Sequence, residues 1–421
     1  MSRKVSLWGA MAAIAGLLLA GCSLVGQPWK KQEPPAPPVV EAAPEPPPLP
    51  ELPLPQSMHR FELSDPDAHV VGEVQLTIAS KEDTLPDIAR RFNVGYEEIV
   101  RANPGVDPWL PGAGKRIVVP TRFVLPNAPH DGVIINLAAL RLYYFPKHAK
   151  GEPQLVYTYP IGIGKVGWKT PEGATRIISR QKDPVWRPTA AVRKEHADND
   201  DPIPAVVPAG PDNPLGKYKF TLGWPSYLIH GTNKPYGVGL RSSHGCIRLY
   251  PEDIEMMFNN APIGTTVRVV NQPFLFAYQD GELLLQAYTV LEDDPRNWSK
   301  AERALLTKSM SPALQQALKT NGVEVNWDAV GAVTKKPRGV PVRVSASGDT
   351  QPDSVESVVA AATLVQNRIP EGSNWDGADD IERDEASYQQ LLREREQPRK
   401  PAAATPVKAT TSPVAAPGPR G

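Results

Sequence analysis

The chain has 421 residues, and at roughly 100–200 residues per domain this length predicts two or three folded units. Its 46 Lys and Arg residues balance its 46 Asp and Glu residues, so the overall charge gives no reason to expect a nucleic-acid partner. Proline accounts for 48 residues, well above the usual level of about 5 %, which predicts long segments outside any packed core. The two cysteines are too few for a disulfide framework, so each needs a separate explanation.

The N-terminus has the pattern of an export signal. Arg3 and Lys4 precede an apolar run, Val5–Leu19, that is shorter than the roughly 20 residues of a membrane-spanning helix. The run ends in Leu19-Ala20-Gly21-Cys22, which resembles a bacterial lipoprotein signal. The resemblance implies that residues 1–21 form the signal peptide and that Cys22 carries the lipid that holds the mature chain on a membrane. The alternative is a plain signal peptide or short anchor with an incidental cysteine.

Two features after Cys22 predict where the protein lies. In lipoproteins of this type a non-acidic residue such as Ser23 permits export to the outer membrane, so we expect a periplasmic protein that is lipid-anchored there. Residues 22–65 form a tether, because prolines recur every two or three residues between Pro28 and Pro55. Such a segment favours extended polyproline II, whose rise of about 3.1 Å per residue holds a folded body well away from the membrane.

Residues 70–121 are predicted to form a small α+β module with the order strand, helix, helix, strand. Val74–Ala79 alternates like a strand, and Asp83-Thr84 can cap a helix whose apolar residues fall on one face. Tyr96–Ala102 forms a second helix, and Arg116–Val119 is the closing strand. The module resembles a LysM domain in its local sequences Asp83-Thr84-Leu85, Ile88–Phe92, Arg101–Pro104 and Leu110-Pro111-Gly112.

The LysM resemblance implies affinity for glycans that contain N-acetylglucosamine, here the glycan strands of peptidoglycan. Asp83, Thr84 and Leu85 are the candidate glycan-binding residues. The sequence departs from the family at Glu82, because the family usually has glycine before the Asp-Thr pair. A LysM module with a purely structural role is the alternative.

Residues 131–270 are predicted to form an all-β domain. Short β-branched or aromatic runs alternate with Gly, Pro and charged turns, as expected for strands. The predicted strands are Val133–Ile135, Arg141–Phe145, Leu155–Tyr159, Thr175–Ser179 and Ser226–Ile229. A helix that begins at Pro251 is expected to pack behind the segment that contains Cys246.

Cys246 has two histidines close to it in the sequence. His230 ends a predicted strand, and His244 precedes Cys246 by two residues in Ser243-His244-Gly245-Cys246. A cysteine is nucleophilic as its thiolate, which an adjacent imidazole favours, so this is the minimal set for acyl transfer. Gly245 permits a sharp turn that could present backbone amides to a developing oxyanion. The alternatives are an inert buried cysteine and a metal site made by His230, His244 and Cys246, although zinc would need a fourth ligand.

These residues, together with Arg248 two positions after the cysteine, resemble the signature of the YkuD-type L,D-transpeptidase catalytic domain. The similarity runs from about Asp131 to Val270 and includes Tyr159–Gly164, Thr170–Gly173 and Trp186–Thr189. The resemblance implies that Cys246 is the nucleophile and that His230 is the general acid and base, with the Gly231 carbonyl fixing its tautomer. It places an oxyanion hole at the amides of His244, Gly245 and Cys246, and it gives Arg248 the task of orienting the stem peptide or bracing the site. Ser243 completes the signature, and no metal or other cofactor is implied.

The implied reaction is acyl transfer on peptidoglycan tetrapeptide stems. A thioester to Cys246 forms as the terminal D-Ala leaves, and an amine then attacks it. An amine from a second stem gives a 3-3 cross-link, whereas a lysine at the end of a protein, such as a cell-wall-anchored lipoprotein, gives protein attachment. Water as acceptor would make the same site an L,D-carboxypeptidase. A non-catalytic, glycan-binding structural lipoprotein is the remaining alternative.

The C-terminal part carries less information. Residues 271–341 are expected to form a small subdomain with a strand at Glu282–Tyr288 and a helix at Ser299–Lys319. Residues 342–421 are expected to be mostly disordered, because polar residues, Ala, Pro and Thr dominate, with a transient helix near Glu382–Glu396.

Overall fold

The structure is a computed structural model that describes residues 51–55, 60–63, 69–346, 353–373 and 375. The predicted signal peptide, Cys22, most of the tether and the helix expected near Glu382–Glu396 lie outside these residues.

The N-terminal module is a strand–helix–helix–strand unit, as predicted. Its elements are β3 (Gln75–Ile78), α1 (Leu85–Arg91), α2 (Tyr96–Ala102) and β4 (Arg116–Val119), with β3 and β4 antiparallel. Thr84 begins α1 with a capping box: its hydroxyl accepts the Asp87 N–H at 3.2 Å, and the Asp87 carboxylate accepts the Thr84 N–H at 2.8 Å. The local sequence therefore determines where the first helix begins.

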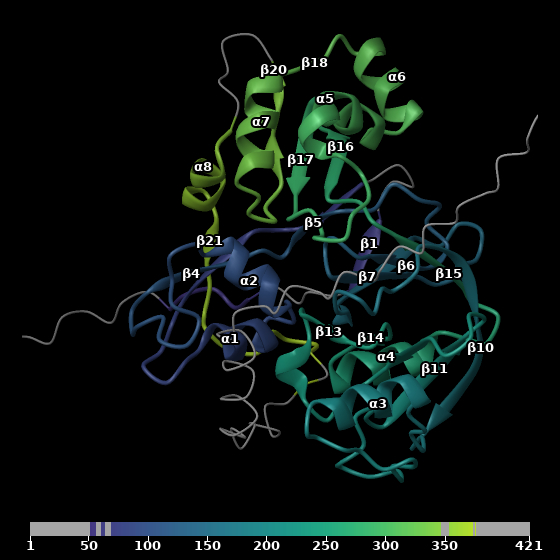
Figure 1. Cartoon of the computed structure of the whole chain (residues 1–421). Coiled ribbons are helices and arrows are strands. Elements are labelled where there is room, and N and C mark those ends of the chain that lie inside the picture. The colour runs from purple at the N-terminus through teal and green to yellow at the C-terminus, as the bar shows by residue number, and fades with distance from the viewer. Residues whose placement is uncertain (1–50, 56–59, 64–68, 347–352, 374, 376–421) are drawn as a thin grey trace, which may run out of the picture. The chain divides into compact units, whose positions relative to one another are not determined.

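A C-terminal segment adds a third strand to this module. β21 (Thr363–Leu364) lies parallel to β3, and the Val365 N–H donates to the Leu76 carbonyl at 2.8 Å (Figure 1). Val365 is 1 % exposed among the apolar residues of the module. The prediction of a mostly disordered tail from residue 342 is therefore wrong for this segment, because burial of a short apolar run offsets the entropy cost of ordering the chain.

The central element is a curled sheet of nine strands in the order β1-β8-β7-β6-β15-β10-β11-β12-β14. Two neighbouring pairs are parallel, β6 with β15 and β12 with β14, and the others are antiparallel. The strands are β1 (Arg60–Leu63), β6 (Gly132–Asn136), β7 (Arg141–Phe145), β8 (Gln154–Pro160), β10 (Gly173–Lys182), β11 (Tyr218–Leu222), β12 (Leu228–His230), β14 (Ile247–Arg248) and β15 (Thr266–Val270). The predicted strands all fall in this sheet, and the predicted helix is α4 (Pro251–Asn260), which packs against β11.

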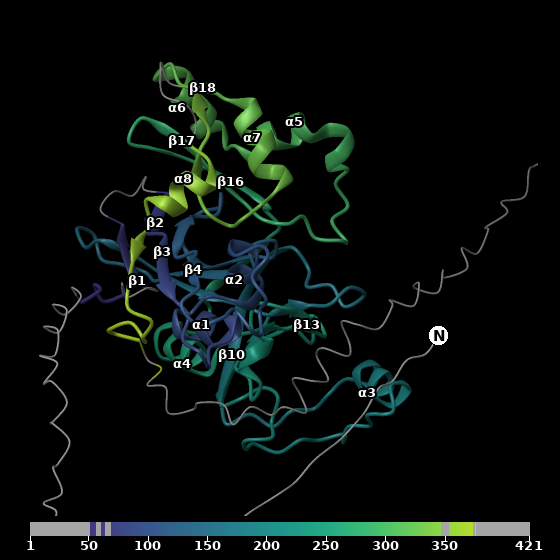
Figure 2. The same ribbon diagram turned by 90° about the vertical axis from the view of Figure 1, so that its left-hand side faces the viewer.

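Two short strand pairs form separate small sheets. β2 (Val70–Gly72) pairs with β5 (Arg122–Val124), and β9 (Ile163–Gly164) pairs in parallel with β13 (Arg241–Ser243). A 3-10 turn, η1 (Pro235–Gly237), lies between β12 and β13. The sequence did not predict α3 (Ala190–Asp198), which lies on a long excursion between β10 and β11 (Figure 2).

The C-terminal subdomain combines a small sheet with helices. The predicted strand is β17 (Glu282–Ala287), which lies between β16 (Phe274–Gln279) and β19 (Val342–Arg343). The single helix predicted for Ser299–Lys319 is in fact two helices. Ser311 is the N-cap of the second, because its hydroxyl accepts the Leu314 N–H. The remaining elements are α5 (Trp298–Ser309), α6 (Pro312–Thr320), β18 (Glu324–Val325), α7 (Trp327–Lys335), β20 (Ser345–Ala346) and α8 (Val355–Ala360).

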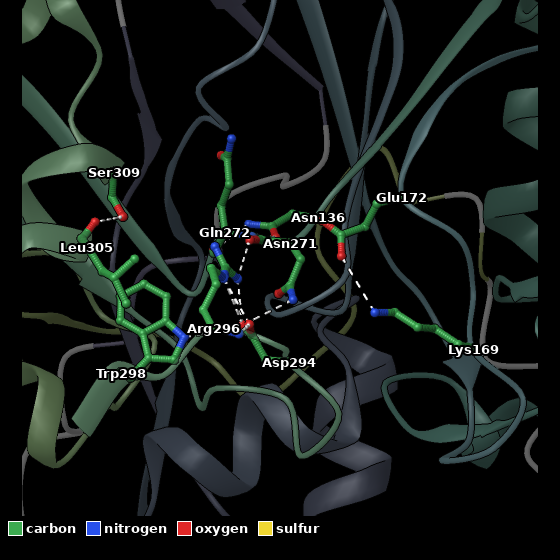
Figure 3. A network of polar contacts seen from close by, with 10 residues as sticks. All are labelled: Asn136, Lys169, Glu172, Asn271, Gln272, Asp294, Arg296, Trp298, Leu305 and Ser309. Carbon is green, nitrogen blue, oxygen red and sulfur yellow. Dashed lines mark hydrogen bonds and ion pairs between the residues drawn. The ribbon is translucent and has the colours of Figure 1, made fainter. Parts of the chain in front are cut away.

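A polar cluster joins this subdomain to the end of the central sheet (Figure 3). The buried carboxylate of Asp294 accepts from Arg296 Nε at 2.8 Å, from Asn271 Nδ2 at 3.2 Å and from Trp298 Nε1 at 3.3 Å. Asn136 on β6 exchanges two hydrogen bonds with the backbone of Gln272. The chain that leaves β15 is therefore fixed to the subdomain by charge-assisted bonds.

The N-terminal module is packed onto the central sheet through a buried ion pair. Arg141 on β7 is 0 % exposed and donates from Nε and Nη2 to the two carboxylate oxygens of Glu98 on α2, at 2.7 and 2.9 Å. The Tyr96 N–H donates to the Val238 carbonyl, and Gly239 has a φ of +83° at this contact. A Cβ at Gly239 would lie 2.2 Å from Tyr96 N, so the close approach requires glycine here.

Candidate active site

The predicted acid–base residue and the predicted nucleophile belong to adjacent parallel segments of the central sheet. His230 is the last residue of β12, and it lies opposite Arg248 on β14. Cys246 directly precedes β14, so the parallel pairing puts it next to the start of β12, whose last residue is His230. The predicted strand Ser226–Ile229 corresponds to β12, with a start two residues later.

Cys246 is the free cysteine of the described residues. Its thiol lies 3.7 Å from the Ser226 carbonyl, which accepts a hydrogen bond from the S–H. Burial raises the pKa of the Cys246 thiol, and the Leu228 backbone and the positive charge of Arg248 offset this only in part. The resting site therefore favours the neutral thiol.

His230 is held as one tautomer. Its Nδ1 donates to the Gly231 carbonyl at 2.6 Å, which leaves Nε2 as the unprotonated nitrogen. The side chain is 5 % exposed. Burial, together with the nearby Arg248 charge, lowers the pKa of His230 to about 3, although the Gly231 bond opposes the shift. A neutral imidazole that can accept a proton is therefore the form that this environment stabilises.

The turn 243–246 is held by its own hydrogen bonds and by a neighbouring loop. Ser243 Oγ donates to the Cys246 carbonyl at 2.6 Å and accepts the Gly245 N–H at 3.2 Å. Thr170 Oγ1 donates to the Gly245 carbonyl at 2.9 Å. Gly245 has a φ of +100°, and a Cβ there would lie 3.0 Å from the Tyr227 ring, so a side chain would strain the turn. Ser243 is thus a bracing residue of the turn, and it already engages the amide of Gly245.

Arg248 has donor capacity that the protein leaves unused. Its Nη1 donates to Ser242 Oγ at 3.4 Å, whereas its Nε is buried and has no hydrogen-bond partner among the described residues. The guanidinium fits against Gly237, where a Cβ would lie 2.5 Å from Nη1. Because a buried, unpaired donor costs about 1–3 kcal/mol, a bound acceptor at this position would be favoured.

The side chain of His244 points toward α3. Its Nε2 lies 3.0 Å from Glu195 Oε2, and the Trp168 ring packs edge-on against the imidazole with centroids 4.8 Å apart. Glu195 also pairs with Lys165, which directly follows β9. Sequence analysis missed Glu195 and Lys165. The cap at Thr189 could have revealed the helix, but no local pattern links residue 195 to residue 244.

The three candidate glycan-binding residues have structural contacts within the module. Leu85 is fully buried, and Thr84 is the cap of α1. The Asp83 carboxylate accepts from the Ser80 N–H at 2.7 Å, from Arg91 Nη2 at 3.0 Å and from Asn367 Nδ2 at 2.6 Å. Asn367 belongs to the C-terminal segment that adds β21 to the module. This loop is therefore already occupied by contacts within the chain.

The described residues hold no group of three or more His, Cys, Asp or Glu side chains arranged to bind a metal ion.

Within the part of the chain that the structure covers, no helix has the length and apolar character needed to cross a membrane.

Comparisons with known families match both parts of the molecule. Residues 130–269 match the YkuD family, described as an L,D-transpeptidase catalytic domain, and residues 80–120 match the LysM domain. The fold and the site thus define an L,D-transpeptidase catalytic domain that follows a LysM domain. Its two domains fit a protein that binds peptidoglycan.

Similarity to curated proteins extends over both domains. The chain is 36 % identical over 290 residues to "Probable L,D-transpeptidase ErfK/SrfK" of Salmonella typhimurium, which covers 68 % of this chain and 91 % of that protein. It is 38 % identical over 303 residues to "Probable L,D-transpeptidase YcfS" of Escherichia coli strain K12, covering 70 % of this chain and 90 % of that one. The chain belongs to the L,D-transpeptidase family, and the protein is an enzyme of that class.

The low pKa of His230 predicts how stability depends on pH. The folded-state pKa of about 3 lies below the ordinary value of 6.5, so between these pH values the unfolded chain binds a proton that the folded chain does not. The contribution of this group to stability is therefore present above pH 6.5 and decreases as the pH falls toward 3. Relative to His230→Gln, the wild type should lose roughly 1–2 kcal/mol of unfolding free energy between pH 7.5 and pH 5, measured by chemical denaturation. Parallel pH profiles for the two proteins would contradict this expectation.

Proposed function

We propose that the protein transfers peptidoglycan stem peptides through a thioester on Cys246, with His230 as general acid and base. The observation that carries this proposal is the hydrogen bond from His230 Nδ1 to the Gly231 carbonyl, at 2.6 Å. It leaves Nε2 free of a proton on a strand that neighbours the cysteine. A neutral imidazole beside a neutral thiol can take the thiol proton as attack begins, so no permanently charged pair is required in the buried site.

The first half of the proposed reaction is acylation. His230 Nε2 takes the proton of Cys246 as the sulfur bonds to the carbonyl carbon of the third stem residue, a diamino acid. The tetrahedral oxyanion accepts hydrogen bonds from the backbone amides of His244 and Cys246, since the Gly245 N–H already donates to Ser243 Oγ. When the bond to the terminal D-Ala breaks, His230 returns the proton to the leaving amine. A thioester and free D-Ala result.

The second half of the proposed reaction is transfer to an amine. The acceptor nitrogen attacks the thioester carbonyl, loses a proton to His230, and displaces the Cys246 sulfur, which regains a proton. An acceptor amine from a second stem gives a 3-3 cross-link, and a lysine at the end of a protein, such as a cell-wall-anchored lipoprotein, gives protein attachment. Water as acceptor gives carboxypeptidase activity. We propose that Arg248, with its unpartnered Nε, binds an acceptor group of the stem peptide.

The test of this proposal uses a purified disaccharide tetrapeptide as donor. Release of D-Ala, a thioester adduct in the intact mass of the protein, and a dimeric muropeptide are expected. With donor alone, a dimer reports transfer to a second stem and a free disaccharide tripeptide reports transfer to water. A second reaction with an added lysine-ended peptide tests protein attachment, so the products rank the three acceptors. Absence of both D-Ala release and adduct would refute the thioester mechanism.

We propose that the protein works in the periplasm, bound to the outer membrane by a lipid on Cys22. The sequence Leu19–Cys22 and the following Ser23 support this location. The LysM module would hold glycan strands near the catalytic domain and raise the local concentration of stems. Its exposed apolar residue Leu110, 80 % exposed and part of the family's Leu-Pro-Gly sequence, supports a contact with glycan.

Replacing Leu110 with serine is expected to weaken binding to peptidoglycan. The change removes an exposed apolar contact without disturbing the core of the module, so the fold should persist. Sedimentation of the lipid-free chain with purified sacculi should fall about 3- to 10-fold for Leu110→Ser. Ile263→Ser is the matched control, since Ile263 is 60 % exposed on the catalytic domain. If both variants sediment like the wild type, Leu110 does not contact glycan.

A further inference from the structure

Helix α3 brings a carboxylate to the turn that carries Cys246. Glu195 on α3 lies with Oε2 at 3.0 Å from His244 Nε2, and the two side chains are 25 % and 23 % exposed. The excursion that carries α3 is itself anchored, because Trp186 and Val207 exchange two backbone hydrogen bonds of 2.9 Å at its base. The contact therefore joins two ordered segments from different parts of the chain.

Glu195 Oε2 and His244 Nε2 are each other's nearest available polar partner. Both atoms are buried, and neither has another hydrogen-bond partner among the described residues. The two atoms lie 3.0 Å apart, close enough to pair, although their geometry is not that of a well-formed hydrogen bond. Because two buried polar atoms without other partners lose free energy when separated, the contact holds the His244 ring in place.

The charges around this contact keep it in the form carboxylate plus neutral imidazole. Burial alone would raise the pKa of Glu195, but the hydrogen bond and the charge of Lys165, together with His244, outweigh it, so the pKa of Glu195 is lowered. Burial and Lys165 lower the pKa of His244, against the opposing effect of Glu195. The other titratable neighbour is His196, whose ring lies 5.6 Å from His244 and whose Nδ1 contacts Asp201. Glu195 therefore selects the His244 tautomer with its proton on Nε2.

Lys165 closes a ring of contacts around the turn. Its backbone N–H donates to the Ser243 carbonyl at 2.9 Å, while its side chain pairs with Glu195. Glu195 in turn contacts His244, the neighbour of Ser243 in the sequence. The turn is thus held from one side by Lys165 and α3 and from the other by Thr170.

We propose that Glu195 is a positioning residue for acyl transfer, which acts through His244 to fix the turn 243–246 and the backbone amides that face the oxyanion. This inference rests on the proposed function of Cys246. Glu195 does not touch the reacting atoms in this role. Its loss should therefore slow the steps that develop an oxyanion, and leave the nucleophilicity of the thiol and the binding of the stem nearly unchanged.

The experiment compares three variants on the full ectodomain. Glu195→Ala removes the carboxylate, Glu195→Gln keeps an acceptor oxygen for the His244 proton, and Asp198→Ala removes an exposed carboxylate from the same helix as a control. With a disaccharide tetrapeptide donor, kcat for D-Ala release should fall about 10- to 100-fold in Glu195→Ala with KM changed less than about 3-fold. Glu195→Gln should retain most of kcat, and Asp198→Ala should equal the wild type.

Two further readouts separate positioning from a general loss of structure. Alkylation of Cys246 by iodoacetamide forms no oxyanion, so its rate should stay within about 2-fold of wild type in every variant. Spectra of protein labelled with ¹⁵N-histidine should report an Nε2–H tautomer at His244 that changes in Glu195→Ala. An unchanged kcat in Glu195→Ala, or a loss of kcat matched by slower alkylation and lower thermal stability, overturns the inference. If the wild type itself releases no D-Ala, the proposed function fails, and the tautomer then decides alone whether Glu195 holds His244.

Discussion

Replacing Cys246 with alanine is expected to abolish acyl transfer while the protein remains folded. The change deletes one sulfur atom. Of the other nucleophilic side chains in the turn 243–246, the Ser243 hydroxyl is bound to the Cys246 carbonyl and His244 lies against Glu195. Loss of the attacking group of a covalent mechanism commonly costs a factor of about 10⁴ or more. D-Ala release from a disaccharide tetrapeptide should therefore drop to the uncatalysed level in the assay.

Two measurements serve as controls for this variant: its thermal stability and its reaction with a covalent inhibitor. The melting temperature of Cys246→Ala should lie close to that of the wild type, because a half-buried thiol contributes little packing. As a second measurement, we expect carbapenem-type β-lactams to acylate Cys246, as its resemblance to the YkuD-type signature implies. Intact-mass spectra should show an adduct on the wild type and none on Cys246→Ala. Residual D-Ala release, or an adduct on the variant, would mean that another residue attacks the substrate.

Local signals were sufficient to predict the N-terminal module and most strands of the central sheet. Thr84 and Asp87 form the capping box that begins α1, and the apolar, aromatic run Arg141–Phe145 corresponds to β7. Motif spacing and resemblance linked His230 to Cys246 as a prediction, and the parallel pairing of β12 with β14 places the two chain segments next to each other. In each case the residues that specify the feature lie within a few positions of one another or on adjacent strands.

Contacts between distant segments could not be predicted in the same way. Glu195 meets His244 across 49 positions, and Asn367 meets Asp83 across 284. Neither pair belongs to a periodic pattern, so only the tertiary structure brings the two partners together. The tail was expected to be disordered because its average composition is polar, yet the few apolar residues of β21 and Val365 are enough to complete the module.

The ion pair between Glu98 and Arg141 also joins distant parts of the chain, and its removal is expected to lower stability strongly. Glu98→Ala is expected to destabilise the protein by about 3–5 kcal/mol, because it leaves the Arg141 guanidinium buried without its partner. The variant also loses the acceptor for the Gly95 N–H at the start of α2. The melting temperature should therefore fall by roughly 10 °C, measured by calorimetry.

A matched control tests whether the loss of stability comes from burial of the charge or from loss of any ion pair. Arg60 and Glu62 also form an ion pair, but their side chains are 54 % and 57 % exposed, so Glu62→Ala should cost less than about 1 kcal/mol. The double variant Glu98→Leu with Arg141→Met should recover much of the loss, because two apolar side chains of similar size leave no buried charge. If Glu98→Ala costs no more than Glu62→Ala, the pair is not desolvated in solution. If Glu98→Ala does cost about 3–5 kcal/mol, the central sheet needs a carboxylate of the LysM module to neutralise its buried Arg141. The LysM module and the catalytic domain then unfold together as one cooperative unit.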